Sequence, residues 1–184
     1  MYRFFDLLFL IILIIPILTL FILTYILCFI FQGQPIFFSQ IRGGFKNKKI
    51  NIYKFRSMKK SKKTNEVTEI GKFLRRYKLD EIPQFYNVFI GELSLIGPRP
   101  LHYEYKNLYT KKQKKRFLVK PGLTGYTQAY LNNNDSWEKK LHYDVWYVKN
   151  KNLTLNFKIL LRTFCNIIFK NFDEKIPKKF NGRN

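Results

Sequence analysis

The sequence predicts a membrane-associated chain in two parts, an apolar N-terminal segment over residues 1–41 and a basic, mostly helical domain over residues 42–184. Three observations support this fold class. No residue between Asp6 and Arg42 is charged. Beyond that segment, several stretches repeat apolar residues at helical spacing. One stretch alone has the composition of a β-strand.

Composition narrows the function but does not decide it. The chain has 184 residues, of which 34 are Lys or Arg and 12 are Asp or Glu, so its net charge is +22. That length suits about one domain. An apolar fraction of 46%, with 19 Phe and 12 Tyr, excludes a disordered chain. So basic a protein needs an anionic partner, which could be nucleic acid, an anionic membrane or a phosphorylated substrate.

The uncharged segment is mostly Leu, Ile and Phe as far as Phe31, and it exceeds the roughly 18 residues that indicate a membrane segment. It is too long for the core of a signal peptide, and no A-x-A-like cleavage site follows it. Two arrangements remain open. A single spanning helix would leave residues 42–184 in the cytoplasm by the positive-inside rule. Alternatively, Pro16 would kink the helix, so that the segment enters and leaves by the same face.

The basic domain begins with a predicted strand at 50–58, which a polar loop at 59–68 follows. Apolar residues at helical spacing then predict helices at 69–78 and 79–90. The composition of residues 104–116 predicts a charged helix with little apolar face.

Two more helices are predicted toward the C-terminus. Asp135 and Glu138 have the spacing of a capping box and should open the first. In the second, at 157–172, a polar residue recurs at every fourth position from Lys158 to Lys170 on an otherwise apolar helix. Such a helix could lie in a membrane interface or pack against the domain, and the pattern leaves both open.

Asp80 and Glu81 are conspicuous because acidic residues are scarce in this chain. Carboxylates are common in a first helical turn, so the pair could simply begin a helix. Alternatively, a helix N-terminus beside Arg75, Arg76 and Lys78 is an anion site. A carboxylate held ionised there could bind a metal or act as a nucleophile.

Two further motifs offer cations. Pro98 and Pro100 fix the backbone around Arg99, which suits bidentate recognition of a phosphate. A plain turn with a solvated arginine has the same pattern. Lys54 would project from the predicted strand, where a solvated strand edge is the simpler interpretation.

Seven motifs occur in order over almost the whole chain: RFFDL at 3–7, YKFRSM at 53–58, FLRR at 73–76, LDEIPQ at 79–84, GELSLIGPRP at 91–100, KPGLTG at 120–125 and LHYDVWYV at 141–148. Together they resemble the monotopic phosphoglycosyl transferases of the bacterial sugar transferase superfamily. The tail KFNGRN at 179–184 resembles that of the small single-domain members that initiate bacterial protein N-glycosylation.

This resemblance implies an enzyme that transfers a sugar 1-phosphate from a UDP-sugar to a polyprenyl (undecaprenyl) phosphate. UMP would be released, and glycan assembly would start on the lipid carrier. By the match to LDEIPQ, Asp80 would be the nucleophile that forms a covalent aspartyl-phosphosugar intermediate, and Glu81 would hold Mg²⁺. Arg75, Arg99 and Lys54 would bind the phosphates.

The resemblance also implies the architecture and the partners. The fold would be a compact α/β unit, helix-rich with little sheet, whose amphipathic helices rest on the cytoplasmic face of the bacterial inner membrane. Residues 1–41 would form a re-entrant helix-break-helix, with Ile15-Pro16 at the break in place of the usual Ser-Pro. The expected partners are the UDP-sugar, the polyprenyl phosphate and membrane lipids. Nucleic acid is not expected, and the oligomeric state stays open, a homo-oligomer included.

Two rival functions are kept beside the enzyme. A membrane-anchored basic binding module would also use the charge, and so would an inactive scaffold in a glycan-assembly complex. The chain departs from the family at Asn132-Asn133, where an Arg that could bind phosphate is missing, and at Tyr77-Lys78, where Thr-Ser is more usual. The motifs do not specify the donor sugar or the glycan.

Overall fold

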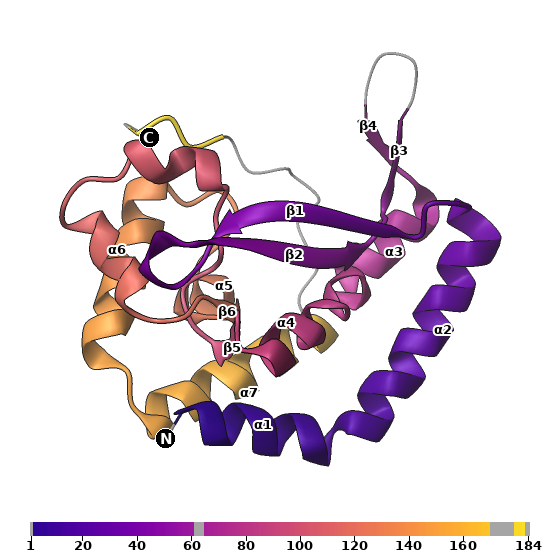
Figure 1. Ribbon diagram of the computed structural model, residues 1–184, viewed down its shortest axis with the longest axis horizontal. Helices are drawn as coiled ribbons and strands as arrows, with labels where there is room; N and C mark the ends of the chain where they lie inside the picture. The colour runs from indigo at the N-terminus through magenta and orange to yellow at the C-terminus, as the bar shows by residue number, and fades with distance from the viewer. Residues whose placement is uncertain (1, 61–64, 170–178, 183–184) are drawn as a thin grey trace.

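The structure, a computed structural model, describes residues 2–60, 65–169 and 179–182. The expected helix-rich fold with little sheet is confirmed, since the described residues form three sheets of two strands each. A helical arm at the N-terminus adjoins a domain of short helices and a long β-hairpin (Figure 1).

Two helices form the apolar arm, α1 (Tyr2–Ile12) and α2 (Ile14–Gln32), and they meet at a wide angle (Figure 1). Proline cannot donate to the carbonyl four residues earlier, and its ring clashes with that carbonyl. For Pro16 that carbonyl belongs to Ile12, the residue at which α1 ends. The predicted break is therefore present. Among the described helices, α2 alone is long and apolar enough to cross a membrane, with a mean hydropathy of 2.7.

Both ends of the arm are attached to the domain. Near its start, the buried Asp6 carboxylate accepts hydrogen bonds from Ser94 Oγ at 2.8 Å and Leu95 N at 3.0 Å. Arg3 donates to two carbonyls near the end of α4 (Gln84–Ile90). Two polar anchors thus hold α1 against the domain.

The other end of the arm packs equally closely. Gln32 Nε2 donates to Thr68 Oγ1 at 2.7 Å. One turn earlier, Cys28 is fully buried in a cluster with Phe55 and Leu74. The arm therefore leaves the domain and returns to it.

An antiparallel hairpin with seven residues in each strand crosses the domain (Figure 1). Its strands are β1 (Phe37–Gly43) and β2 (Lys49–Phe55), with Phe38 opposite Lys54 and Arg42 opposite Ile50. The strand predicted at 50–58 is confirmed in β2. Its partner β1 was not predicted, because its side chains are mostly exposed and show no buried alternation.

The remaining strands are short. The predicted loop at 59–68 is wrong in part, because β3 (Met58–Lys60) pairs with β4 (Asn65–Val67) as an antiparallel hairpin. A parallel pair joins β5 (Ser94–Ile96) to β6 (Gly122–Thr124). Close backbone packing accompanies that pair, since a Cβ at Gly122 would lie 2.0 Å from the nitrogen of Gly97.

The first predicted helix of the domain is confirmed, and the second is interrupted. Thr68 caps α3 (Glu69–Arg76) by accepting from the nitrogen of Gly71 at 3.0 Å. The expected helix at 79–90 divides into the 3-10 helix η2 (Leu79–Glu81) and α4, with Pro83 between them.

The charged helix predicted at 104–116 is wrong. The chain there forms two 3-10 helices, η3 (Tyr103–Asn107) and η4 (Gln113–Leu118). A charged segment with little apolar face offers no stripe to bury, and packing of such a stripe supplies most of a helix's stability in proteins. A short helix α5 (Tyr126–Tyr130) follows.

Both C-terminal helices are present. The cap of α6 (Trp137–Asn150) is Ser136, which accepts from the nitrogen of Lys139, so the helix predicted to open at Asp135 begins one residue later. The last helix is α7 (Leu153–Phe169), and the rest of its predicted range lies outside the described residues. Six of its large apolar side chains are exposed: Leu153, Phe157, Leu161, Phe164, Ile168 and Phe169.

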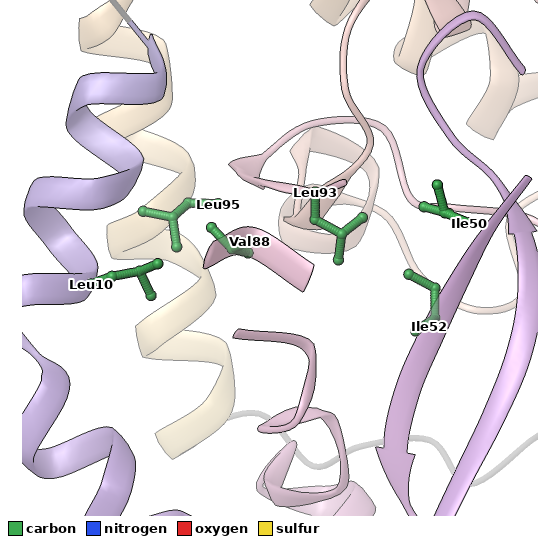
Figure 2. Packing of buried hydrophobic residues seen from close by; sticks show 6 residues of the cluster. All are labelled: Leu10, Ile50, Ile52, Val88, Leu93 and Leu95. Atoms are coloured by element: carbon green, nitrogen blue, oxygen red, sulfur yellow. The ribbon is translucent and has the colours of Figure 1, made fainter. Parts of the chain in front are cut away.

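A hydrophobic core joins the arm to the domain (Figure 2). It contains six buried side chains from α1, β2, α4, β5 and the turn before β5: Leu10, Ile50, Ile52, Val88, Leu93 and Leu95. The arm is therefore part of the fold, and it positions the hairpin and α4 that flank the site below.

Candidate active site

The two predicted carboxylates lie together in η2, where Asp80 is 7% exposed and Glu81 is 8% exposed. Lys78 precedes them in the left-handed conformation, with φ at 59°, and this ends the turn that follows α3. Pro83 then starts α4. The carboxylates thus occupy a tight turn between two helices and not the first turn of a continuous helix.

Glu81 is held by two of the predicted cations. Its Oε1 lies 2.5 Å from Lys54 Nζ and 3.2 Å from Arg99 Nη2. Burial alone would raise the pKa of Glu81, but the charges of Lys54, Arg99 and Lys78 outweigh burial and hold the pKa well below its usual range. Glu81 is therefore a fixed anion at neutral pH.

Asp80 differs from its neighbour. Within the described part of the chain, its carboxylate makes no hydrogen bond. Burial, and then repulsion from Glu81, raise the pKa of Asp80 against the opposing charges of Lys54, Lys78 and Arg75. A desolvated carboxylate beside cations, with its lone pairs unused, is suited to attack an electrophile.

The structure brings the other predicted residues to the same site. Arg75 lines it from α3, and its Nε donates to Ser57 Oγ at 2.9 Å. Pro98 and Pro100 are buried on either side of Arg99, whose guanidinium reaches Glu81. The Lys54 side chain, which is 22% exposed, is therefore not at a solvated strand edge, whereas the Arg99 side chain contacts Glu81 and stays 40% exposed.

Sequence reasoning missed the support beneath Arg99. The carbonyl of Arg99 accepts from Arg116 Nη2 at 2.7 Å. Arg116 in turn forms a buried ion pair with Asp144 at 2.7 Å. Asp144 belongs to a motif noted above, yet nothing local in the sequence indicates that it pairs with Arg116. Lys78, which the sequence placed beside the predicted anion site, also lines the cavity, and burial lowers its pKa.

A cavity of about 2410 Å³ contains this cluster and has two kinds of wall. The charged wall is formed by Lys54, Arg75, Lys78, Asp80, Glu81 and Arg99. The apolar wall comes from the arm and α7: Phe9, Leu13, Pro16, Ile17, Leu20, Phe157, Leu160 and Phe164. Pro16 thus lies near the break and also faces the cavity. Such a space suits an amphiphile with an anionic head.

The donor set at the site suits Mg²⁺. The described residues contain no group of three or more His, Cys, Asp or Glu side chains that could hold a metal by themselves. Mg²⁺, however, is commonly held by one or two carboxylates together with substrate phosphates and water. Asp80 and Glu81 are two adjacent oxygen ligands, and the described ion pairs of Glu81 both engage Oε1.

Comparison with known proteins agrees with the motifs. The chain matches the model of the family described as "Bacterial sugar transferase" over residues 1–170. It is similar to an uncharacterized sugar transferase, EpsL, of Bacillus subtilis (strain 168), with 44% identity over 144 residues. That alignment covers 74% of this chain and 71% of EpsL.

Two longer relatives have names that state a reaction. The UDP-glucose:undecaprenyl-phosphate glucose-1-phosphate transferase of Klebsiella pneumoniae is 36% identical over 159 residues, or 77% of this chain and 33% of the relative. The UDP-N-acetylgalactosamine-undecaprenyl-phosphate N-acetylgalactosaminephosphotransferase of Aeromonas hydrophila is 34% identical over 150 residues. That alignment covers 73% of this chain and 36% of the relative. The chain therefore spans about a third of the length of these two relatives. The likeness of the tail to initiators of protein N-glycosylation stays a prediction.

Proposed function

Because the chain belongs to the bacterial sugar transferase family, we propose that it transfers a sugar 1-phosphate from a UDP-sugar to a polyprenyl phosphate through a covalent intermediate on Asp80. One observation carries this proposal. Asp80, buried and without a hydrogen bond in the described part of the chain, lies beside Glu81 and lines a cavity that has both a charged wall and an apolar wall.

In the first step, a carboxylate oxygen of Asp80 attacks the phosphorus that bears the sugar. The bond from that phosphorus to the oxygen of UMP breaks, and UMP leaves with the electron pair. An acyl phosphate joins the sugar phosphate to Asp80. The attack of an anion on a diphosphate requires charge compensation, which Arg75 and Lys78 can supply along with Lys54 and Arg99.

In the second step, an oxygen of the polyprenyl phosphate attacks the same phosphorus. The bond to Asp80 breaks, the carboxylate returns, and a polyprenyl-diphosphate sugar results. Support comes from the two walls of the cavity, since the lipid phosphate can reach Asp80 while the polyprenyl chain lies against α2 and α7. Because UMP leaves and a covalent intermediate forms before the polyprenyl phosphate reacts, we expect ping-pong kinetics.

Magnesium fits this site as a cofactor. Glu81, with a diphosphate oxygen of the substrate, would hold the ion, and Asp80 would lie next to it. When bound, Mg²⁺ supplies charge neutralisation at the diphosphate and at the leaving UMP.

The proposal includes a re-entrant arm at the cytoplasmic face of the inner membrane. Arg3 and Asp6 anchor one end of the arm to the domain, and Gln32 and Cys28 anchor the other end. A helix that crosses a bilayer separates its two ends by about 30 Å of hydrocarbon. Attachment of both ends to one domain supports entry and exit by the same face.

The chemistry is tested with the full chain in detergent, Mg²⁺ and a panel of UDP-sugars. Without polyprenyl phosphate, the protein should release at most one UMP and gain the mass of one sugar phosphate. Adding polyprenyl phosphate should remove that mass and start turnover. Asp80→Asn should neither gain the mass of a sugar phosphate nor turn over, whereas Glu138→Gln, at an exposed carboxylate, should behave as the parent does. Absence of UMP release with every donor would favour a binding or scaffold protein.

Cysteine labelling in intact cells tests the topology separately. With Cys28 and Cys165 replaced by Ala, Phe4→Cys places a single thiol at a side chain that is 66% exposed. A re-entrant arm predicts labelling only after the cytoplasmic side is opened, as for Glu104→Cys in the domain. Labelling of Phe4→Cys from outside intact cells would show that the arm spans the membrane.

A further inference from the structure

A second polar cluster lines the cavity beyond the carboxylates. Gln40 and Arg42 project from β1, and His102 follows the Pro-Arg-Pro motif. Arg42 Nη2 donates to Gln40 Oε1 at 2.5 Å, and Gln40 Nε2 lies 3.2 Å from His102 Nδ1. An isolated antiparallel bridge between the backbones of Arg42 and His102 holds the two segments together. The cluster is therefore a connected chain of three side chains.

Strand geometry places this cluster relative to the carboxylates. Side chains alternate along a strand, so Phe38, Gln40 and Arg42 share one face of β1, and Phe38 lies opposite Lys54. At about 3.4 Å per residue, Gln40 is about 7 Å and Arg42 about 14 Å farther along the strand. β1 runs away from α2 and toward α6 (Figure 1). The cluster thus extends the site away from the apolar wall.

The hydrogen-bond chain fixes what the cluster offers to a ligand. A guanidinium only donates, so Gln40 must direct its oxygen at Arg42 and its nitrogen at His102. The amide nitrogen also only donates, so Nδ1 of His102 accepts and the ring carries its proton on Nε2. Burial, and then the charge of Arg42, lower the pKa of His102, which agrees with a neutral ring. The N–H groups left for a ligand, on His102 Nε2, the Gln40 amide and the Arg42 guanidinium, are donors.

We propose that Gln40, Arg42 and His102 form the subsite for the uridine part of the donor, with uracil recognised through its carbonyl oxygens. This inference rests on the proposed function, since it assigns the far end of that cavity. Uracil presents two carbonyl acceptors, whereas cytosine replaces one of them with an amino donor. A cluster of donors therefore favours uracil.

Aromatic side chains at the same end suit a planar base. The ring of Tyr105 lies 5.4 Å from that of His102, and the ring of Trp137 lies 6.4 Å from Tyr105. All three line the cavity. Stacking on aromatic rings is a sequence-tolerant way to hold a base, so specificity would come from the donors of His102 and Gln40. The direction of β1 also places the leaving UMP at the polar end, where it can depart before the lipid phosphate attacks.

Binding to the full chain in detergent tests the subsite without turnover. Affinities for UMP, CMP and inorganic pyrophosphate are measured by calorimetry for the parent, His102→Ala and Gln40→Ala. Ser39→Ala is the matched control, because Ser39 is exposed and adjacent to Gln40 on the opposite face of β1. The parent should bind UMP about 10-fold more tightly than CMP, as expected for one hydrogen bond gained and one mismatch avoided.

His102→Ala and Gln40→Ala should reduce that preference toward one while leaving pyrophosphate affinity unchanged, which also shows that the variants fold. Ser39→Ala should match the parent. The subsite is overturned by a parent that binds no UMP or binds UMP and CMP equally. It is also overturned if the variants weaken UMP and pyrophosphate by the same factor, as at a phosphate site. A UMP preference without release of UMP from any UDP-sugar would instead overturn the transferase and leave the subsite standing.

Discussion

Two buried aspartates line the same cavity and differ in how their charge is compensated. Asp144 accepts from Arg116 Nε at 3.1 Å, from Arg116 Nη2 at 2.7 Å and from Thr127 Oγ1 at 3.1 Å. Asp80 accepts no hydrogen bond from the described residues, although Lys54, Lys78 and Arg75 surround it. The first aspartate uses its charge within the fold. The second keeps its charge available for a substrate.

The comparison of Asp144 with Asp80 shows where this fold tolerates an unfavourably buried carboxylate. Buried polar groups in native proteins are nearly always hydrogen-bonded, and exceptions call for an explanation. Burial raises the pKa of Asp144, but the bonds from Arg116 and Thr127 oppose that shift. For Asp80 the charges of nearby cations oppose that shift, and the described residues donate no hydrogen bond to its carboxylate. We expect substitutions at the two sites to separate activity from stability.

The largest expected effect is the contrast between Asp80→Asn and Asp144→Asn. Asp80→Asn should lower kcat on the order of 10⁴-fold, because the proposed nucleophile is lost. Asp144→Asn should instead lower the free energy of unfolding by about 3–5 kcal/mol, because it leaves Arg116 buried without a counter-charge. UMP release and denaturant unfolding in detergent measure the two effects. A similar loss of stability in both variants would remove the distinction.

The sign of the pH dependence follows from the raised pKa of Asp80. The folded state binds this proton more tightly than the unfolded state does. Asp80 therefore favours folding at acid pH, and that contribution is lost as pH rises through the folded-state pKa. Relative to the parent, Asp80→Asn should become more stable as pH rises through this range. Unfolding curves of the parent and of Asp80→Asn at several pH values measure this change. If the pKa of Asp80 were ordinary, the difference in unfolding free energy between the two proteins would not vary with pH.

The next effect concerns Arg116. Arg116→Met leaves Asp144 buried and unpaired, and should cost about 3–5 kcal/mol of unfolding free energy. The double variant Arg116→Met/Asp144→Leu should recover most of that stability, since apolar groups of similar size often replace a buried pair without loss. It should not recover full activity, because the bond from Arg116 to the carbonyl of Arg99 is gone. Full recovery of both would mean that Arg116 has no part in positioning Arg99.

Arg99 gives a smaller effect, visible in the pH profile. Its guanidinium helps to hold the pKa of Glu81 well below the usual range. A lowered carboxylate pKa stabilises the fold above the unfolded-state value, and this contribution is lost as pH falls through the folded-state pKa. Arg99→Gln should raise the Glu81 pKa, move the acid limb of kcat/KM to higher pH, and lower activity about 10- to 100-fold. Lys111→Gln, which removes one exposed charge, should leave the limb in place.

The same contrast explains how much the sequence could predict. Asp80, Glu81, Arg75 and Arg99 meet in the cavity as the motifs predicted, because each lies in a short segment with distinctive residue types. The pairing of Arg116 with Asp144 joins positions 28 residues apart and has no local signal.

The predictions of other elements failed for local physical reasons. β1 was missed because its exposed side chains show no alternation, although Gln40 and Arg42 belong to it. Pro83 separates η2 from α4 within the stretch 79–90, whose apolar spacing alone predicted a single helix. Sequence patterns therefore predicted which residues meet at the site better than the contacts that orient them.

The smallest effect compares two hydroxyls, one at each aspartate site. Ser57 Oγ accepts from Arg75 at the active carboxylates, and Thr127 Oγ1 donates to Asp144. Each bond is expected to be worth about 0.5–1.5 kcal/mol. Ser57→Ala should lower kcat/KM about 2- to 10-fold with little change in stability, because it frees Arg75 to move without removing its charge. Thr127→Val should lower stability by a similar free energy and leave kcat/KM nearly unchanged. If Thr127→Val slowed turnover as much as Ser57→Ala did, the Asp144 site would belong to the catalytic machinery rather than to its support.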